Sequence, residues 1–322
     1  MTPDDVVQVR RSKSRATDPP PSSEFYFDLA SLTKLLTAER VMQLVAAGKI
    51  DLTEEAAHYL ASPMSIVADV AVQDLLDFRG GFPPHIPLKE LEPFRSNPLA
   101  YVSMRRDEVL GRLIASADAF RSTDRSRRRY NNMSYVLLGE LVAKFLPWER
   151  VNADLAIEGL TRTVYNPLGA GIAWENIAPT ELDAWRSSRC HGVVHDETAF
   201  LLAGYAGHAG IFSTVSDIAL LVQGLIANDE RWALSSQIDR ICRHPDSSQL
   251  GVFRSPSEYA AEAVSGVPRN AIGLTGFTGT SLWMDVDRRI GVVLLTNRVY
   301  EGRSDEWIQV ARARVHQHVF NS

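Results

Sequence analysis

The chain has 322 residues, of which 45% are hydrophobic and 23% are charged, and its formal net charge is -5. This composition excludes a disordered or fibrous protein, and the negative charge gives no general reason to expect nucleic acid as a partner. The two cysteines, Cys190 and Cys242, are too few for a disulfide scaffold, although they leave room for one bridge.

The first predicted element is a short strand around residues 6–9, followed by a polar, proline-rich connection. Residues 31–47 are good helix formers without Gly or Pro and end at Gly48, which predicts a helix. Because this helix is apolar on most faces, we expect it to be buried. Residues 51–198 contain mainly helical segments separated by loops, and we interpret them as an all-helical lobe.

The second half of the chain contains signals for helices and for a hairpin. Thr214-Val215-Ser216-Asp217 has the pattern of a capping box, and apolar residues follow at helical spacing, which predicts an amphipathic helix. The β-rich runs 280–285 and 290–296 flank a short charged turn and predict a hairpin. A last helix follows Ser304, and its predicted apolar face comprises Trp307, Ile308, Ala311 and Val315.

These elements predict an α/β (α+β) fold, in which helices flank an antiparallel β-sheet beside the all-helical lobe. No linker of biased composition divides the chain, so we expect a single domain over residues 1–322. Its α/β lobe would comprise roughly residues 1–30 and 205–322, and its helical lobe roughly residues 31–204.

Ser31-Leu32-Thr33-Lys34 opens the predicted buried helix. This spacing places the serine hydroxyl and the lysine ammonium on the same helix face. A lysine shielded from water can take the serine proton, and the N-terminus of the helix favours a developing oxyanion near Ser31. A capping serine with a solvated lysine fits the same spacing, so the motif alone leaves both interpretations open.

Tyr130-Asn131-Asn132 precedes a second apolar helix, which we predict at residues 133–142. Tyr130 is a candidate proton relay between Ser31 and a leaving group. Asn132 is a candidate for hydrogen-bonding a substrate carbonyl while it orients the lysine. The alternative is a helix cap at Asn131 or Asn132 with a packed tyrosine.

The segment from Leu274 to Thr280 contains two glycines, Gly276 and Gly279, directly before the predicted hairpin strand. Glycines beside a strand indicate close approach of the backbone to a ligand, because no Cβ stands in the way. Thr275 is a candidate for binding a substrate carboxylate or carbonyl, and the N–H of Phe277 is a candidate oxyanion-hole donor together with the N–H of Ser31. A bulged edge strand is the alternative.

Ser-x-x-Lys, Tyr-x-Asn and Thr-Gly in this order resemble the serine β-lactamase and penicillin-binding-protein superfamily, in particular the class C-type branch with esterases and D-aminopeptidases. The resemblance covers most of residues 25–298 and includes Gly207-His208-Ala209-Gly210. It implies a β-lactamase/transpeptidase-like fold with the site where the two lobes meet. It further implies a role for each motif residue: Ser31 as nucleophile, Lys34 as its base, Tyr130 as proton relay, Asn132 as amide-positioning group, and Thr275 and Gly276 as the lining of the substrate strand.

The chain departs from this family pattern in two places. Relatives have Lys or His where this chain has Leu274, so a cationic or polar partner for a substrate carboxylate and for Tyr130 is missing. Relatives also have a longer segment before the nucleophile, with a helix and two strands. We therefore expect a smaller sheet, or a natural chain that begins earlier and carries a signal peptide.

We predict a serine hydrolase that acts through a Ser31 acyl-enzyme on an ester, an amide or a D-amino-acid peptide. The missing cation at Leu274 favours carboxyl-ester substrates. The first alternative is a non-catalytic penicillin-binding-protein-like protein that binds a ligand or partner, and the second is a β-lactamase or DD-peptidase. The expected partner is a small-molecule or short peptide substrate, no cofactor is expected, and the oligomeric state stays open.

Two further expectations concern metals and location. Cys190, His191, His195, Asp196 and His208 are metal-capable types, but Gly192-Val193-Val194 interrupts helical spacing, so we predict no metal site. The sequence as written has neither a signal peptide nor an apolar run of about 18 residues, which predicts a cytoplasmic protein without a membrane span. We interpret the arginines before Tyr130 as a solvated loop, with an anionic partner as the alternative: Arg121, Arg125, Arg127, Arg128 and Arg129.

Overall fold

The computed structural model describes residues 24–60, 70–125, 127–243, 251–259, 261–304 and 307–321, and the strand predicted at 6–9 lies outside them. The α-helices of these ranges are α1 Thr33–Ala46, α2 Ala56–Tyr59, α3 Val72–Leu76, α4 Arg106–Ala119, α5 Met133–Ala143, α6 Val151–Ile157, α7 Glu197–Leu201, α8 Val215–Ala227, α9 Ser235–Arg243 and α10 Trp307–Phe320. The strands are β1 Phe27–Asp28, β2 Thr163–Tyr165, β3 Leu182–Asp183, β4 Ser188–Arg189, β5 Ile211–Ser213, β6 Ile272–Thr275, β7 Ser281–Asp285 and β8 Ile290–Leu294.

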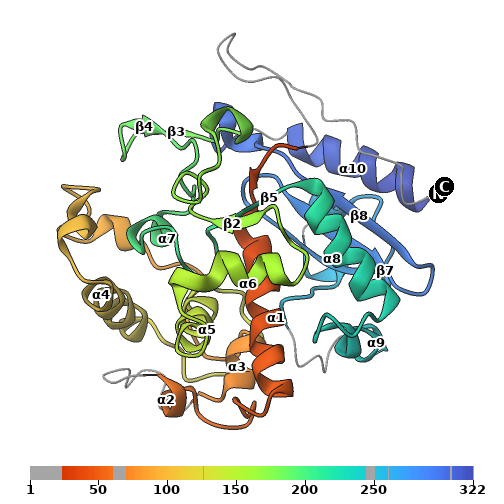
Figure 1. The fold of residues 1–322 in the computed structure, drawn as a ribbon, viewed down its shortest axis with the longest axis horizontal. Helices are drawn as coiled ribbons and strands as arrows, with labels where there is room; N and C mark the ends of the chain where they lie inside the picture. The colour runs from red at the N-terminus through yellow and green to blue at the C-terminus, as the bar shows by residue number, and fades with distance from the viewer. Residues whose placement is uncertain are drawn as a thin grey trace.

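Strands β6, β7 and β8 form an antiparallel sheet in that order, which confirms the predicted hairpin. Side chains alternate between its two faces. Trp283 pairs with Val292 and packs with Phe320 of α10, whereas the neighbouring pair Leu282 and Val293 belongs to the main core. Helix α8 covers the main-core face, and α10 lies on the other face (Figure 1).

A second sheet has the order β1-β5-β2, and only its strand β1 precedes the first helix in the chain. Ser213 of β5 pairs with Phe27 on one side and with Thr163 on the other. Strand β2 therefore joins this sheet, and β3 and β4 form a two-stranded sheet of their own. The prediction that residues 51–198 are all-helical was wrong in part, because these three strands lie within that range. The lobe boundaries themselves stay a prediction.

Helix α1 runs through the middle of the molecule and packs against α5 (Figure 1). The predicted burial of this helix is confirmed, and a 3-10 turn, Ala30–Leu32, leads into it. Its buried charge at Glu39 is satisfied, because the carboxylate accepts the backbone N–H groups of Ala233 at 2.7 Å and Leu234 at 2.9 Å. Most buried polar groups in folded proteins have such partners.

The helices predicted at residues 133–142, after Thr214 and after Ser304 are also present. Helix α5 matches the helix predicted at 133–142, and the Thr214 hydroxyl caps α8 by accepting the Asp217 N–H. The predicted face of α10 was wrong in part, because its buried residues are Ile308, Arg312, His316 and Phe320. Arg312 is buried because it hydrogen-bonds the loop after β6, a contact that hydrophobic periodicity cannot predict. Among the described residues, no helix combines the length and apolar character needed to cross a membrane.

Candidate active site

Ser31 and Lys34 face each other at the start of α1, as the helical spacing predicted. The Lys34 Nζ lies 3.0 Å from Ser31 Oγ, 3.0 Å from Asn132 Oδ1 and 3.1 Å from the His208 carbonyl oxygen. The lysine side chain is fully buried, which excludes the solvated alternative. Its nitrogen is therefore held against the serine by two further oxygen atoms.

Tyr130 reaches the same serine from the loop before α5. Its hydroxyl donates to Ser31 Oγ at 2.7 Å, and its ring packs on Phe78 with the centroids 4.9 Å apart. The Lys34 Nζ also lies 5.0 Å from the centroid of the Tyr130 ring. Two proton-exchanging groups thus contact one hydroxyl, which is the geometry that nucleophilic catalysis by serine needs.

The sequence left open whether the asparagines before α5 cap this helix or orient the lysine. Asn131 takes the first role and Asn132 the second. The Asn131 Oδ1 accepts the Ser134 N–H at 2.7 Å and so satisfies the beginning of α5. Asn132 is consequently free to place its Oδ1 on Lys34. Its side chain also lines a cleft together with Asp196 and Glu197, next to the catalytic candidates.

The backbone before the serine is strained. Ala30 has φ +47°, a conformation that residues with a Cβ rarely adopt. The Asp28 carboxylate stabilises this turn, because its Oδ1 accepts the Ala30 N–H at 2.8 Å and its Oδ2 accepts the His195 N–H at 2.7 Å. Burial raises the pKa of Asp28 in spite of these two hydrogen bonds. The sequence analysis missed Asp28, although it lies three residues before the nucleophile candidate.

The loop after β6 is fastened to the same turn. Thr278 Oγ1 donates to the Asp28 carbonyl at 2.7 Å, and Thr280 Oγ1 donates to the Leu29 carbonyl at 3.0 Å. A Cβ on Gly276 would lie 2.7 Å from the Leu29 carbonyl oxygen, so this approach requires glycine. The predicted close approach at Gly276 is therefore to the turn that precedes Ser31.

Arg312 of α10 also fixes this loop, through hydrogen bonds to its backbone. Its Nη2 donates to the carbonyl oxygens of Gly276 at 3.2 Å and Thr280 at 2.8 Å. Burial lowers the pKa of Arg312 to about 10, so the arginine still carries its charge at neutral pH. Sequence periodicity offered no signal for this residue, because it expects apolar side chains on the buried face of a helix.

Phe277 lies at the tip of the loop with 46% of its side chain exposed. Its ring stacks on His195 with the centroids 5.5 Å apart, and the Arg298 guanidinium lies 4.8 Å from its centroid. No described residue accepts a hydrogen bond from the Phe277 N–H. This N–H therefore remains a candidate hydrogen-bond donor to a ligand.

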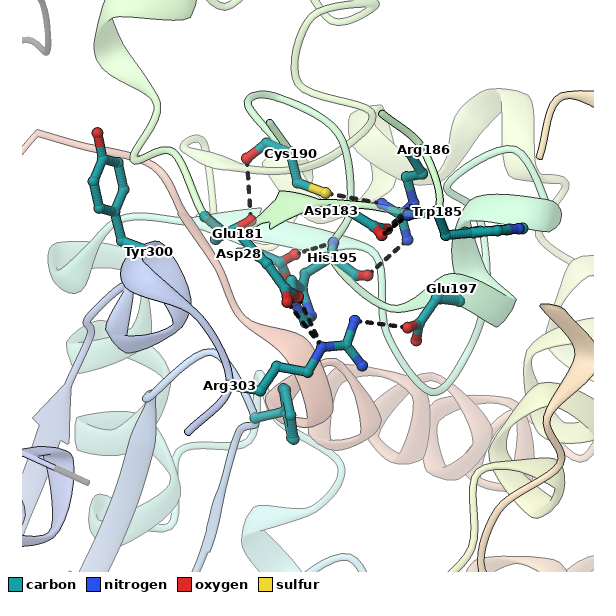
Figure 2. A network of polar contacts seen from close by, with 12 residues as sticks. Asp28, Glu181, Asp183, Trp185, Arg186, Cys190, His195, Glu197, Tyr300 and Arg303 are labelled. Carbon is teal, nitrogen blue, oxygen red and sulfur yellow. Dashed lines mark hydrogen bonds and ion pairs between the residues drawn. The ribbon is translucent and has the colours of Figure 1, made fainter. Parts of the chain in front are cut away.

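A network of ion pairs surrounds His195, the residue on which Phe277 stacks, and Figure 2 shows this network. His195 Nε2 lies 2.7 Å from Glu181, and Arg303 bridges Glu181 at 2.8 Å and Glu197 at 2.7 Å. Burial alone would raise the pKa of Glu181, but hydrogen bonds from His195 and Arg303 lower it to about 2. The network fixes the His195 ring on which Phe277 rests.

The same contacts account for the residues considered as metal ligands. His195 pairs with Glu181, and His208 Nε2 lies 2.8 Å from Asp196 Oδ1. Burial would raise the pKa of Asp196, but His208 and the nearby Lys34 ammonium hold it well below its usual range. Cys190 is a free, buried thiol that contacts Arg186 (Figure 2). Over the described ranges, no three His, Cys, Asp or Glu side chains gather as a metal site requires.

The predicted substrate strand is only partly polar. Thr275 is half-buried at the end of β6, whereas Leu274 is buried in the main core and pairs with Leu282. Leu274 thus adds no polar group to the site.

Two of the arginines before Tyr130 are not simply solvated, because Arg121 donates to the Gly80 carbonyl and Arg128 to the Gly251 carbonyl.

Comparisons with known proteins give a consistent picture. The family model described as Beta-lactamase matches residues 2–315. The N-acetylmuramyl-L-alanine amidase of Bacillus subtilis is 29% identical over 84% of this chain and 68% of its own length. A putative D-alanyl-D-alanine carboxypeptidase of Escherichia coli K12 is 28% identical over 87% of this chain and 70% of its own. The structure of a β-lactamase/D-alanine carboxypeptidase from Yersinia pestis superposes with a TM-score of 0.64 at 18% identity, covering 95% of this chain and 86% of its own.

Proposed function

The chain belongs to the β-lactamase family of serine hydrolases, and on this premise we propose that Ser31 is its nucleophile, with Lys34 as base and Tyr130 as proton relay. One observation carries the assignment. Ser31 Oγ lies within hydrogen-bond distance of both Lys34 Nζ, at 3.0 Å, and the Tyr130 hydroxyl, at 2.7 Å. Such a pair can remove the serine proton and pass it to a leaving group.

In the acylation step, Ser31 Oγ attacks the carbonyl carbon of the substrate while Lys34 takes the hydroxyl proton. The N–H groups of Ser31 and Phe277 would hold the oxyanion. The bond to the leaving group then breaks, and the proton that Lys34 took from Ser31 is passed through Tyr130 to that group, which leaves Lys34 neutral again. In the second step water attacks the acyl carbon, the ester bond to Ser31 Oγ breaks, one water proton restores the Ser31 hydroxyl, and the carboxylic acid leaves.

Members of this family act on small molecules or peptides, and we infer an ester, an amide or a D-amino-acid peptide as the substrate class here. The names of the relatives support the amide and peptide members of this class, because they describe an amidase and a putative carboxypeptidase. Asn132 and the adjoining cleft would receive the acyl side of the substrate, since the amide lies next to Lys34.

Covalent labelling with a fluorophosphonate, followed by mass mapping of the peptides, tests the assignment. We expect a stoichiometric adduct on Ser31 and none in Ser31→Ala. Ser216→Ala, on the exposed first turn of α8, is the matched control and should label like the wild type. A wild-type protein that takes no label, or a Ser31→Ala variant with full esterase turnover, would refute the assignment.

A further inference from the structure

Arg254 lies beside the position where the family cation is missing. Its backbone pairs with Gly273 in both directions, since the Arg254 N–H donates to the Gly273 carbonyl at 2.9 Å and the Gly273 N–H donates back at 3.0 Å. Arg254 is thus an extension of the sheet at the outer edge of β6, opposite the residue that precedes Leu274. The sequence analysis did not single out this residue.

The guanidinium of Arg254 is held between two aromatic rings. Its Cζ lies 5.2 Å from the centroid of the Tyr130 ring and 4.2 Å from that of Tyr259. Its Nη2 donates to the Glu258 carbonyl at 2.8 Å, and its Nε lies 3.4 Å from the Glu258 carboxylate. Arginine held in this way loses little conformational entropy when it binds an anion.

Arg254 retains hydrogen-bonding capacity for a ligand. No described residue pairs with its Nη1, and the side chain is 18% exposed. The Glu258 carboxylate, its only acidic partner in the described ranges, is shared with Arg128 at 3.6 Å. The guanidinium is therefore both positioned and open to a further acceptor.

The backbone groups of Thr275 lie on the same edge of β6 as the bridge to Arg254. Alternate residues of a strand direct their backbone groups to the same edge, so the peptide groups of Thr275 face the same side as those of Gly273. Tyr130, which the guanidinium overlies, donates to Ser31 Oγ. Arg254 is thus connected to Ser31 through Tyr130, whose ring it contacts and whose hydroxyl meets the serine.

We propose that Arg254 replaces the cation that Leu274 lacks, and that it selects substrates whose leaving group carries a carboxylate, such as acyl-D-amino acids and depsipeptides. The proposal rests on Ser31 being the nucleophile. A planar guanidinium with free N–H groups matches a carboxylate, and a charged hydrogen bond contributes more to binding than a neutral one. Leu274 can then be apolar, because Arg254, which pairs with Gly273 at the edge of β6, supplies the charge.

Two matched aryl esters test this specificity. One is an acetylglycyl ester of 3-hydroxybenzoate, and the other is the same ester of methyl 3-hydroxybenzoate, in which the carboxylate is masked. We expect the wild type to have a higher kcat/KM for the free carboxylate. In Arg254→Gln this preference should fall about tenfold or more. Arg231→Gln, an exposed and distant arginine, is the matched control and should keep the preference.

The outcomes separate this proposal from the proposed function. A wild type without preference for the free carboxylate, or an Arg254→Gln variant in which both esters slow equally, overturns the proposal. Loss of fluorophosphonate labelling at Ser31 in the wild type overturns the function instead. If Arg254→Gln does not fold, the wild-type preference is measured against ionic strength. A charge-based preference must decline with added salt, and a constant preference overturns the proposal.

Discussion

The Lys34 Nζ is hydrogen-bonded to the main-chain carbonyl of His208, 174 residues further along the chain, at 3.1 Å. The neighbouring Gly207 carbonyl accepts the Thr37 hydroxyl at 2.7 Å, so two successive carbonyls lie along α1. A Cβ on Gly207 would lie 2.2 Å from the Tyr135 carbonyl oxygen, and only glycine permits this approach. The position of the candidate base is therefore set by a remote segment as well as by its own helix.

Removing the lysine amine should abolish activation of the serine. We expect Lys34→Gln to label with a fluorophosphonate about 10²- to 10⁴-fold more slowly, the range that general base catalysis contributes. The labelling rate is measured by stopped flow at neutral pH. Lys144→Gln, which changes an exposed lysine just after α5, should label at the wild-type rate. Equal rates in Lys34→Gln and the wild type would exclude Lys34 as the base.

Tyr130→Phe separates the hydroxyl of this residue from its ring. The ring contact with Phe78 remains, so we expect the melting temperature to stay near the wild-type value. Turnover should fall by about 10²-fold or more, because the leaving group loses its proton donor. The measurement combines ester kinetics with thermal unfolding. Our assignment would be wrong if turnover persisted while the fold was intact.

Gly276→Ala should disrupt the turn that precedes Ser31. The new Cβ would lie 2.7 Å from the Leu29 carbonyl and 2.1 Å from Thr280 Oγ1, so one of these groups must move. We expect loss of turnover together with a destabilisation of about 1–3 kcal/mol, as in overpacked cores. Gly111→Ala in α4 is the matched control, since nothing lies within 4 Å of its added Cβ and a helical alanine is about 0.5–1 kcal/mol more stable. Wild-type activity in Gly276→Ala would contradict the observed packing.

Stability should depend on pH through Asp77. Burial raises the pKa of this carboxyl from 3.8 to about 7, although its Oδ1 accepts the Gly251 N–H at 2.9 Å. Between these two values the folded state binds more protons than the unfolded state, so the free energy of unfolding falls as pH rises. The stability that depends on a protonated Asp77 carboxyl is fully present below pH 3.8 and is lost as pH passes about 7.

Urea denaturation at pH 5 and pH 8 measures this dependence. The stability lost by the wild type between the two conditions should exceed the loss in Asp77→Asn, by on the order of a few kcal/mol. Asp118→Asn removes an exposed carboxyl of α4 and should behave like the wild type. If Asp77→Asn and the wild type showed the same pH dependence, the folded carboxyl would titrate normally.

The sequence by itself determined the parts of the site that lie close together along the chain. Ser31 and Lys34 share a face because a helix has a fixed period, and Asn131 caps the helix that follows it. Alternation and turn residues predicted the hairpin of β7 and β8. Each of these predictions depends on local geometry, which short stretches of sequence encode.

Only the tertiary structure decided how the distant parts meet. The Thr278 hydroxyl donates to the Asp28 carbonyl, although 250 residues separate them in the chain. An isolated bridge to β6 holds the backbone of Arg254, and its guanidinium lies over the Tyr130 ring. Such contacts depend on strand register and on the packing of separate elements, and neither has a period that can be read along the chain. For this reason the sequence predicted the candidate acylating residues around Ser31, whereas the cation that we assign to substrate selection became visible only in the folded protein.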